Sequence, residues 1–566
     1  MKLKYLSVSI AVALMSGAAQ AAPLVPADAT GTVYFGGATA SSGFIKNSII
    51  DRTCAGTTAR EITVYQVDAD DYTVICDLDP ATGATGTMMA IKQGGGSGDG
   101  TVPVSDPLNN AILFPVPPAN PASVCAAPVT AQTGQGTVYT FYNNCLIGNT
   151  QVQGADIGAS DVEPGLFYDV NTPSTGNPFP PSDLSKLTVR PLASLVFGVA
   201  ATESLRDALQ AMQFTSSSPC NPGNANHDLL MPQTIAGITY DVGRIAAGTA
   251  NATADASPSL GTATVGDSEQ CMPNMSRAEV VGVFTGGITN WTQIKQGNTN
   301  LVQAALSAGV QVPDAAAALN NQRVHICRRS TGSGTNAQFQ AYYLRRPCAK
   351  DIAGTPVAQA MLGPDTAASA NFGGDQVVLA NRGSSDLGRC LDDLQTGLQS
   401  SSSTYFVPGG TPIDNPRFAW GMGYQSAEKN QSLSRGWRFI KVDGFAPTLQ
   451  NVYRANYLNA AEATCQINNA DVGPGDFIMA QAIVEEVCAA DTISVFNEDQ
   501  NFLHAFGQSG WLAVPDDDKH GNSTAVPEAP ALPSDLMNPN GPVPVSSWTR
   551  GGNNCSVAKV IDDVEI

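Results

Sequence analysis

The stretch Val324–Thr335, VHICRRSTGSGT, decides the predicted fold, because a strand pattern runs directly into a turn of glycines and hydroxyls. Val324–Arg329 has the apolar residues of a short buried strand. Ser330–Thr335 follows without a spacer and leads into an aromatic segment that stops before Pro347. We therefore predict a strand, a turn and a helix that begins at the turn.

Such a turn is suited to binding an anion. The first backbone N–H groups of a helix have no partner within the helix and carry partial positive charge, and glycine lets a ligand approach them. Arg329 stands just before the turn, and its guanidinium can donate paired hydrogen bonds to an oxyanion. One Gly/Ser turn alone is more often an ordinary helix cap, so the prediction depends on further turns of this kind.

Further turns of this composition follow other strand patterns. Gly36–Thr39 (GGAT) comes after a strand at 32–35, and a glycine-rich loop at Gly94–Gly100 comes after one at 88–92. Gly158–Asp161 (GASD) ends a buried pattern that starts at 156, and a short strand at 195–199 precedes a helix at about 202–212. Alternating strands and helices predict an α/β protein rather than an all-β one.

The three segments GGAT, GASD and RRSTGSGT resemble the anion-binding segments of periplasmic phosphate-binding proteins. These are the substrate-binding subunits of phosphate ABC importers, and the DING proteins are their relatives. Four supporting segments occur in the family's order, namely Met275–Trp291, Gly383–Ser385, Gly421–Tyr424 and Ala446–Val452. The resemblance covers about residues 32–515.

The resemblance implies a two-lobed type 2 periplasmic-binding fold, here with long insertions and a C-terminal tail. We place the chain crossings near residues 196 and 459. The expected division is a signal peptide at 1–21, lobe I at 22–195 and 460–515, lobe II at 196–459, and a Pro/Asp-rich tail at 516–566.

The resemblance also implies a set of phosphate ligands in the cleft between the lobes. They are Thr39, Ala40, Ser97, Asp161, Arg329, Ser333, Gly334 and Thr335. The chain has Thr331 where the family usually has an aspartate that pairs with the arginine. This departure predicts that Arg329 is less restrained.

Asp161 carries a prediction about ligand identity. A carboxylate beside a bound anion repels it unless the anion brings a hydrogen to donate. Hydrogen phosphate has that hydrogen and sulfate does not, so we expect discrimination against sulfate. The alternative is that Asp161 only caps a turn, as aspartate often does.

Composition argues against one class of function, and the N-terminus predicts where the protein is located. The net charge of −20 argues against nucleic-acid binding, which needs clustered Lys and Arg. Met1–Ala21 has the lysines, apolar run and A-x-A ending of a secretory signal, and no later stretch is long and apolar enough to span a membrane. No cysteine stands at the cleavage site to carry a lipid, so we predict a periplasmic or secreted protein.

Twelve cysteines in an exported chain favour disulfides. Sequence spacing favours three pairs, Cys54–Cys76, Cys125–Cys145 and Cys465–Cys488, and an even count implies that Cys555 fastens the tail to the body. No C-x-x-C occurs and the four histidines are scattered, so we predict no metal and no cofactor. The chain also lacks a G-x-S-x-G elbow or a paired Ser/His spacing, so an enzyme such as a phosphatase is not expected.

Two functions remain open. The first is a phosphate receptor that delivers its ligand to the permease of an ABC importer. The second is a surface or matrix protein that reuses the same fold without transport, which the insertions, the disulfides and Thr331 favour.

Overall fold

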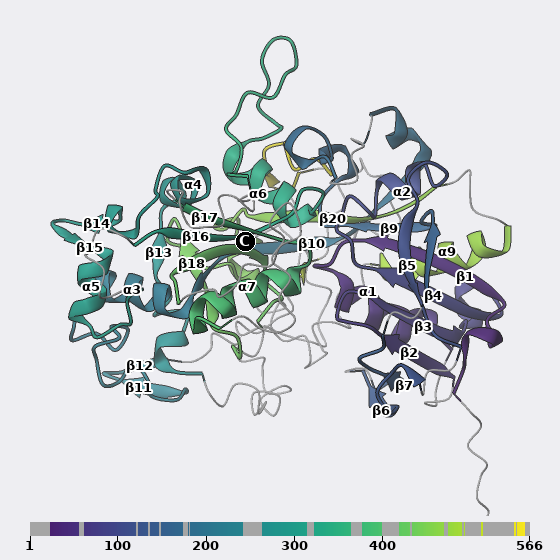
Figure 1. Ribbon diagram of the computed structural model, residues 1–566, viewed down its shortest axis with the longest axis horizontal. Coiled ribbons are helices and arrows are strands. Elements are labelled where there is room, and N and C mark those ends of the chain that lie inside the picture. Colours follow the sequence, from purple (N-terminus) through teal and green to yellow (C-terminus); the bar gives the residue numbers. More distant parts are fainter. Residues whose placement is uncertain are drawn as a thin grey trace, which may run out of the picture.

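A fifteen-stranded mixed β-sheet extends through the computed structural model of the protein (Figure 1). The structure describes residues 23–55, 61–119, 123–133, 136–146, 149–173, 179, 181–240, 263–313, 322–363, 376–398, 418–430, 433–468, 474–489, 492, 511–512, 548–550 and 552–560. The predicted signal peptide at 1–21 and most of the tail lie outside these residues. No helix within the described ranges combines the length and the apolar character that a membrane crossing requires.

Helices alternate with the strands along the chain. The helices are α1 Ser42–Ser48, α2 Val102–Ser105, α3 Glu203–Gln213, α4 Arg277–Thr285, α5 Leu301–Ser307, α6 Gly334–Leu344, α7 Ser384–Thr396, α8 Leu449–Tyr453 and α9 Pro474–Val487. The strands of the large sheet are β1 Gly31–Gly37, β2 Ile62–Gln66, β3 Tyr72–Asp77, β4 Thr87–Gln93, β6 Val129–Gln132, β7 Val138–Tyr142, β9 Ile157–Ser160, β10 Leu187–Thr202, β13 Asn274–Met275, β16 Val324–Arg329, β17 Gln376–Asn381, β18 Gly421–Ser426, β19 Trp437–Val442, β20 Ala460–Asn468 and β21 Trp511–Leu512. Four small ribbons pair β5 Ile112–Val116 with β8 Asn149–Gln153, β11 Gln233–Ile235 with β12 Ile238–Tyr240, β14 Lys295–Gln296 with β15 Thr299–Asn300, and β22 Trp548–Thr549 with β23 Lys559–Val560.

Strand β10 joins two halves of the molecule. Up to Val196 it pairs with β20, and from Phe197 onward it pairs with β18 and β19. The strand has 16 residues, so the predicted short strand at 195–199 was wrong in length. The sequence does not indicate that the strand continues through Pro191, because proline cannot donate a hydrogen bond to a neighbouring strand. The strand register shifts between Pro191 and Ala193.

Figure 1 shows the halves on either side of β10 and β20. We call the half with β1–β9, α1, α2 and α9 lobe I, and the half with α3–α8 and β11–β19 lobe II. The predicted fold class, an α/β protein of two lobes, is confirmed. The first predicted crossing lies beside the partner exchange in β10 and the second beside the start of β20, while the domain boundaries stay a prediction.

Parallel pairing brings the predicted turns together. In lobe I, β1 is parallel to both β4 and β9, so the turns after these three strands leave the same edge of the sheet. In lobe II, β16 is parallel to β17, with Arg329 opposite Asn381. The turn before α6 therefore lies beside the turn before α7.

Ten of the twelve cysteines, all within the described ranges, form five disulfides. The predicted pairs Cys54–Cys76 and Cys125–Cys145 are confirmed, and the other pairs are Cys220–Cys271, Cys327–Cys390 and Cys348–Cys555. The predicted pair Cys465–Cys488 is wrong, because both thiols are free. They are hydrogen-bonded to each other, and burial raises the pKa of Cys488 well above its usual value, which disfavours the thiolate that disulfide exchange needs.

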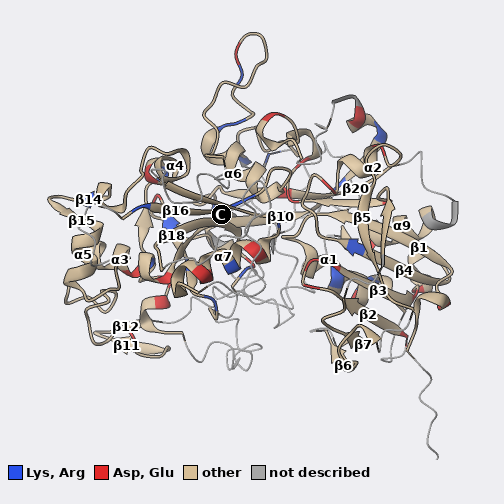
Figure 2. Cartoon of the chain, viewed as in Figure 1, with Lys and Arg blue, Asp and Glu red and all other residues tan. Residues whose placement is uncertain are grey.

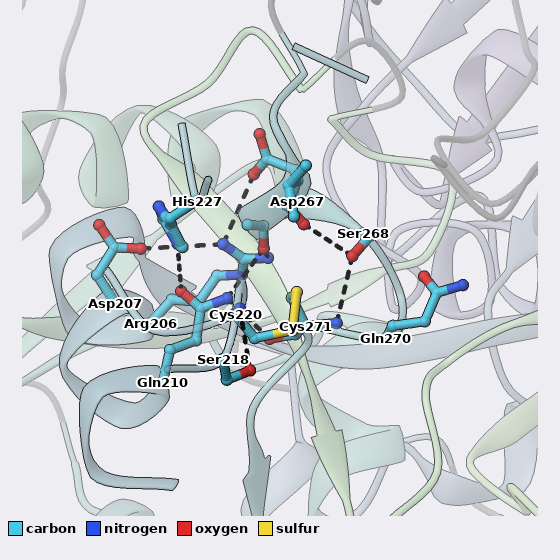
Figure 3. The surroundings of a disulfide bond; sticks show 12 residues. Arg206, Asp207, Gln210, Ser218, Cys220, His227, Asp267, Ser268, Gln270 and Cys271 are labelled. Carbon is cyan, nitrogen blue, oxygen red and sulfur yellow. Dashed lines mark hydrogen bonds and ion pairs between the residues drawn. A yellow bond between two sulfur atoms is a disulfide. The ribbon is translucent and has the colours of Figure 1, made fainter. Parts of the chain in front are cut away.

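Cys220–Cys271 fastens an insertion between α3 and α4 (Figure 3). Around it, Gln210 Nε2 donates to the carbonyls of Gly266 and Cys271 at 2.9 and 2.7 Å. The guanidinium of Arg206 is buried within 3.6 Å of the Asp267 carboxylate. These hydrogen bonds and this ion pair join α3 to the segment that holds Gly266, Asp267 and Cys271, and so stabilise the insertion.

The tail segment 548–560 is fastened to both lobes and to β20. Arg550 donates through its side chain to the carbonyls of Ala460 and Leu458, and through its backbone N–H to Glu462. The Asn554 N–H donates to Glu163 of lobe I, and Cys555 is bonded to Cys348 of lobe II. The prediction that Cys555 fastens the tail to the body is confirmed.

Candidate functional site

The turn between β1 and α1 reaches lobe II through Thr39. Gly37 has φ +106° in this turn, and a Cβ there would lie 2.2 Å from the Ala159 carbonyl oxygen, so only glycine fits. Thr39 and the following Ala40 are buried. Thr39 Oγ1 lies 3.1 Å from Ser384 Oγ at the start of α7.

The glycine-rich loop Gly94–Gly100 carries Ser97, which is fully buried. Its Oγ accepts a hydrogen bond from the Asp161 N–H at 2.9 Å. The loop also contacts lobe II across the junction, because the Gly98 N–H donates to the Gly332 carbonyl at 2.7 Å. The loop thus contacts two of the other predicted turns.

Asp161 follows β9 and is 1% exposed. Its Oδ2 accepts a hydrogen bond from Thr335 Oγ1 at 3.4 Å, whereas its buried Oδ1 has no hydrogen-bond partner among the described residues. Burial raises the pKa of Asp161 to about 6, although the nearby charge of Arg329 lowers it. A buried acceptor without a donor is unfavourable, so Asp161 is suited to accept a hydrogen from a bound ligand.

Arg329 ends β16 and is 2% exposed. Its Nε and Nη2 donate to the Arg382 carbonyl at 3.2 and 2.7 Å, and its Nη1 donates to Ser384 Oγ at 2.6 Å. Burial lowers its pKa, and the Asp161 carboxylate is the strongest opposing charge. Arg329 thus donates three hydrogen bonds to Ser384 of α7 and to the turn before it. That Thr331 leaves it less restrained than the family's aspartate would stays a prediction.

The first turn of α6 packs closely against lobe I. Ser333 caps the helix, and its Oγ accepts a hydrogen bond from the Asn336 N–H at 3.4 Å. A Cβ on Gly334 would lie 2.3 Å from Ser97 Oγ and 2.7 Å from Asp161 Cβ. Glycine therefore lets the free N–H groups of the helix start approach the two lobe I side chains.

The structure thus gathers the predicted residues at the junction of the lobes. Contacts join Ser97, Asp161, Gly334 and Thr335 in one set, and Ser384 joins Thr39 to Arg329 in a second. The charge of Asp161 acts on Arg329 and so relates the two sets, while Ala40 and Ser333 adjoin Thr39 and Gly334 in the chain. That they bind a ligand stays a prediction.

Three further residues belong to this junction and were missed by sequence reasoning. Ser384 links Arg329 to Thr39, and only its place in the matched segment Gly383–Ser385 gave a signal. Asp70 and Lys429 lie in two other turns. Lys429 lowers the pKa of both Asp70 and Asp161, and Arg329 does the same. An acidic turn such as 68–71 is usually exposed, so its sequence did not indicate a buried carboxylate.

Lys92 holds a buried charge behind the first turn. Its Nζ donates to the carbonyls of Gly37 and Gln93 at 2.7 and 2.9 Å, and burial lowers its pKa to about 8. Figure 2 shows positive and negative residues side by side along α7, on the other side of the junction. Local charges of both signs therefore dominate the field there despite the net charge of −20.

Among the described residues, no three His, Cys, Asp or Glu side chains lie together in a way that fits a metal ion. A pocket beside the tail segment, lined by residues such as Glu163, Tyr168, Lys350 and Cys555, contains none of the eight predicted ligands. The described side chains at the junction supply hydrogen-bond donors, carboxylates, the Arg329 guanidinium and the Lys429 ammonium group.

Comparison with known proteins gives distant structural likenesses. No family model and no curated protein sequence matches the chain. Among solved structures, it is similar to a protein described as a phosphate ABC transporter substrate-binding protein from Clostridium perfringens with bound phosphate, at 10% identity and TM-score 0.32, over 80% of this chain and 93% of that one.

Two others are an ABC-type phosphate transport receptor from Vibrio cholerae and PstS from Borrelia burgdorferi. The receptor has 11% identity and TM-score 0.26, with 60% of this chain and 77% of that one covered. PstS has 10% identity and TM-score 0.27, with 81% and 96% covered.

Proposed function

We propose that this protein binds inorganic phosphate at the junction of its lobes. The observation that carries the proposal is the meeting of Arg329, the free N–H groups at the start of α6 and the unpartnered Oδ1 of Asp161. The first two donate to an oxyanion, and the third accepts from it. Phosphate at neutral pH offers both kinds of partner.

The same contacts favour phosphate over sulfate. Asp161 is buried, so water cannot satisfy its Oδ1 once the lobes enclose a ligand. A ligand with a P–OH group donates to that oxygen, whereas sulfate adds a second negative charge without a donor. The expected difference is large because a site built around a polar partner rejects an analogue that lacks it.

Calorimetric titration with phosphate and with sulfate tests the proposal. The wild type should bind phosphate much more tightly than sulfate, and Arg329→Ala should abolish phosphate binding. Arg454→Ala removes the same charge from an exposed position and should bind phosphate like the wild type. No phosphate binding by the folded wild type, or equal affinity for sulfate, would exclude this function.

As the cellular role, we propose capture of phosphate outside the cytoplasmic membrane for the permease of an ABC importer. When two lobes close over a ligand, the closed form differs in shape from the open form, and a permease can bind the closed form selectively. Loss of phosphate uptake on deletion, restored by wild type but not by Arg329→Ala, is the expected result.

The second candidate is an extracellular structural protein that keeps the fold without transport. The tail segment favours it, because 548–560 fastens both lobes to β20 and restricts their relative movement. Normal phosphate uptake after deletion, with the protein found on the cell surface or in the medium, would support this role and exclude import.

A further inference from the structure

Asp70 brings a second carboxylate to the junction. It lies in the turn between β2 and β3, is 6% exposed, and packs against the glycine-rich loop, where a Cβ on Gly94 would lie 2.5 Å from Asp70 Cβ. Across the junction, a Cβ on Gly383 would lie 3.2 Å from Asp70 Oδ2. The carboxylate therefore sits against the residue that precedes α7, next to Ser384.

Asp70 has the same unmet hydrogen-bonding capacity as Asp161. Its Oδ1 is buried and has no partner among the described residues. Both carboxylates face the same two cations of lobe II, Arg329 and Lys429. Two separate acids, each with one unused acceptor atom, thus point to the same part of the junction.

The other charges around Asp70 come from several elements. The groups that face it or adjoin it are Asp68 and Asp71 of its own turn, Tyr72 of β3, Lys92 of β4, Asp99 of the glycine-rich loop, Arg329 of β16, Arg382 before α7, Asp386 of α7, and Lys429 with Glu428 after β18. Cations and acids are therefore mixed, and an entering anion meets no large excess of positive charge. Each extra negative charge on the ligand is then unfavourable, and each hydrogen that it donates is favourable.

We propose that Asp70 is a specificity-determining residue that, together with Asp161, makes the site select the singly charged, doubly protonated form of phosphate. Dihydrogen phosphate has two P–OH groups, one for each free carboxylate oxygen, and a single negative charge for Arg329. Hydrogen phosphate leaves one carboxylate without a donor and adds a charge beside it. This inference rests on the proposed phosphate binding.

The test is the affinity for inorganic phosphate measured by calorimetry between pH 6.5 and 8.5. For the wild type, the affinity for total phosphate should fall with rising pH, approaching roughly tenfold per pH unit where the doubly protonated form is scarce. Asp70→Asn replaces an acceptor by a group that also donates, so its affinity should fall much less over this range. Asp77→Asn removes an exposed carboxylate from the same hairpin and should keep the wild-type slope.

The possible results are distinct. Wild-type affinity that is constant or rises with pH would overturn the selection of the singly charged form, even if Asp70→Asn does not fold. A pH slope in folded Asp70→Asn equal to that of the wild type would overturn the role of Asp70. Absence of phosphate binding by the wild type at every pH would instead overturn the proposed function itself.

Discussion

Gly334 and Asp161 are in contact across the two lobes, so that a Cβ on Gly334 would lie 2.7 Å from Asp161 Cβ and 2.9 Å from its Oδ2. The start of α6 in lobe II and the turn after β9 in lobe I approach so closely that no side chain fits at position 334. This contact allows the helix start and the carboxylate to face one ligand.

Gly334→Ala should therefore weaken phosphate binding by at least tenfold, because the added methyl group holds the lobes apart at the site. Calorimetric titration measures the effect. Gly165→Ala is the control, since a Cβ at Gly165 has nothing within 4 Å and should leave the affinity unchanged. Equal affinities for the two variants would show that the lobes need not approach this closely to bind.

Asp161→Asn should admit sulfate. The amide donates a hydrogen bond to a sulfate oxygen and has no charge to repel it, so the ratio of phosphate to sulfate affinity should fall by about tenfold or more. Competition of sulfate against phosphate measures the ratio. A ratio that stays at the wild-type value would show that Asp161 only caps its turn.

Asp161 should also make stability depend on pH in the ligand-free protein. Its pKa in the fold is about 6, above the ordinary value of 3.8, so the folded state holds this proton more tightly than the unfolded state does. Its contribution to stability is complete below about pH 3.8 and is lost as pH rises through about 6.

The measurement is urea unfolding of wild type and Asp161→Asn at pH 4.5 and 7.5 in phosphate-free buffer. Between pH 4.5 and 7.5, the free energy of unfolding of the wild type should fall relative to that of the variant by on the order of 2 kcal/mol. The size follows because one pKa unit corresponds to about 1.4 kcal/mol. A difference between the proteins that is the same at both pH values would contradict the raised pKa.

The tail disulfide should stabilise the protein more than a disulfide that closes a short loop. Cys348–Cys555 spans 207 residues and Cys125–Cys145 spans 20. In the chain-entropy description, replacing both cysteines of the longer pair by serine should reduce the free energy of unfolding by about 2 kcal/mol more than the same change in the shorter pair. Equal losses in urea unfolding would contradict this dependence on loop length.

The elements around the site were predictable where the pattern was local. The strand Val324–Arg329 was predicted with its bounds, and the helix predicted to begin at the following turn is confirmed as α6. In these segments the residue pattern alone selects the backbone conformation. The class of the fold followed from the same alternation of strands and helices.

The rest of the junction depends on contacts between distant residues. Ser384 lies 345 residues from the threonine that it contacts, and Asp70 meets the charges of Arg329 at the end of β16 and of Lys429 after β18. No pattern near these residues indicates burial, because the lobes bury them only when the whole chain has folded. The thiols of Cys465 and Cys488 also adjoin each other, yet spacing alone could not indicate their free state.

The tail also determines when the fold is complete during synthesis. Glu462 receives the backbone N–H groups of Arg550 and Gly552, and Glu163 receives that of Asn554, so both carboxylates lack these donors until residues near 550 leave the ribosome. Each lobe can begin to fold earlier, whereas the joint between them gains these hydrogen bonds and its disulfide only after residues 550–555 have been made. A nascent chain released before that point would carry both lobes without the fastening that sets their mutual position.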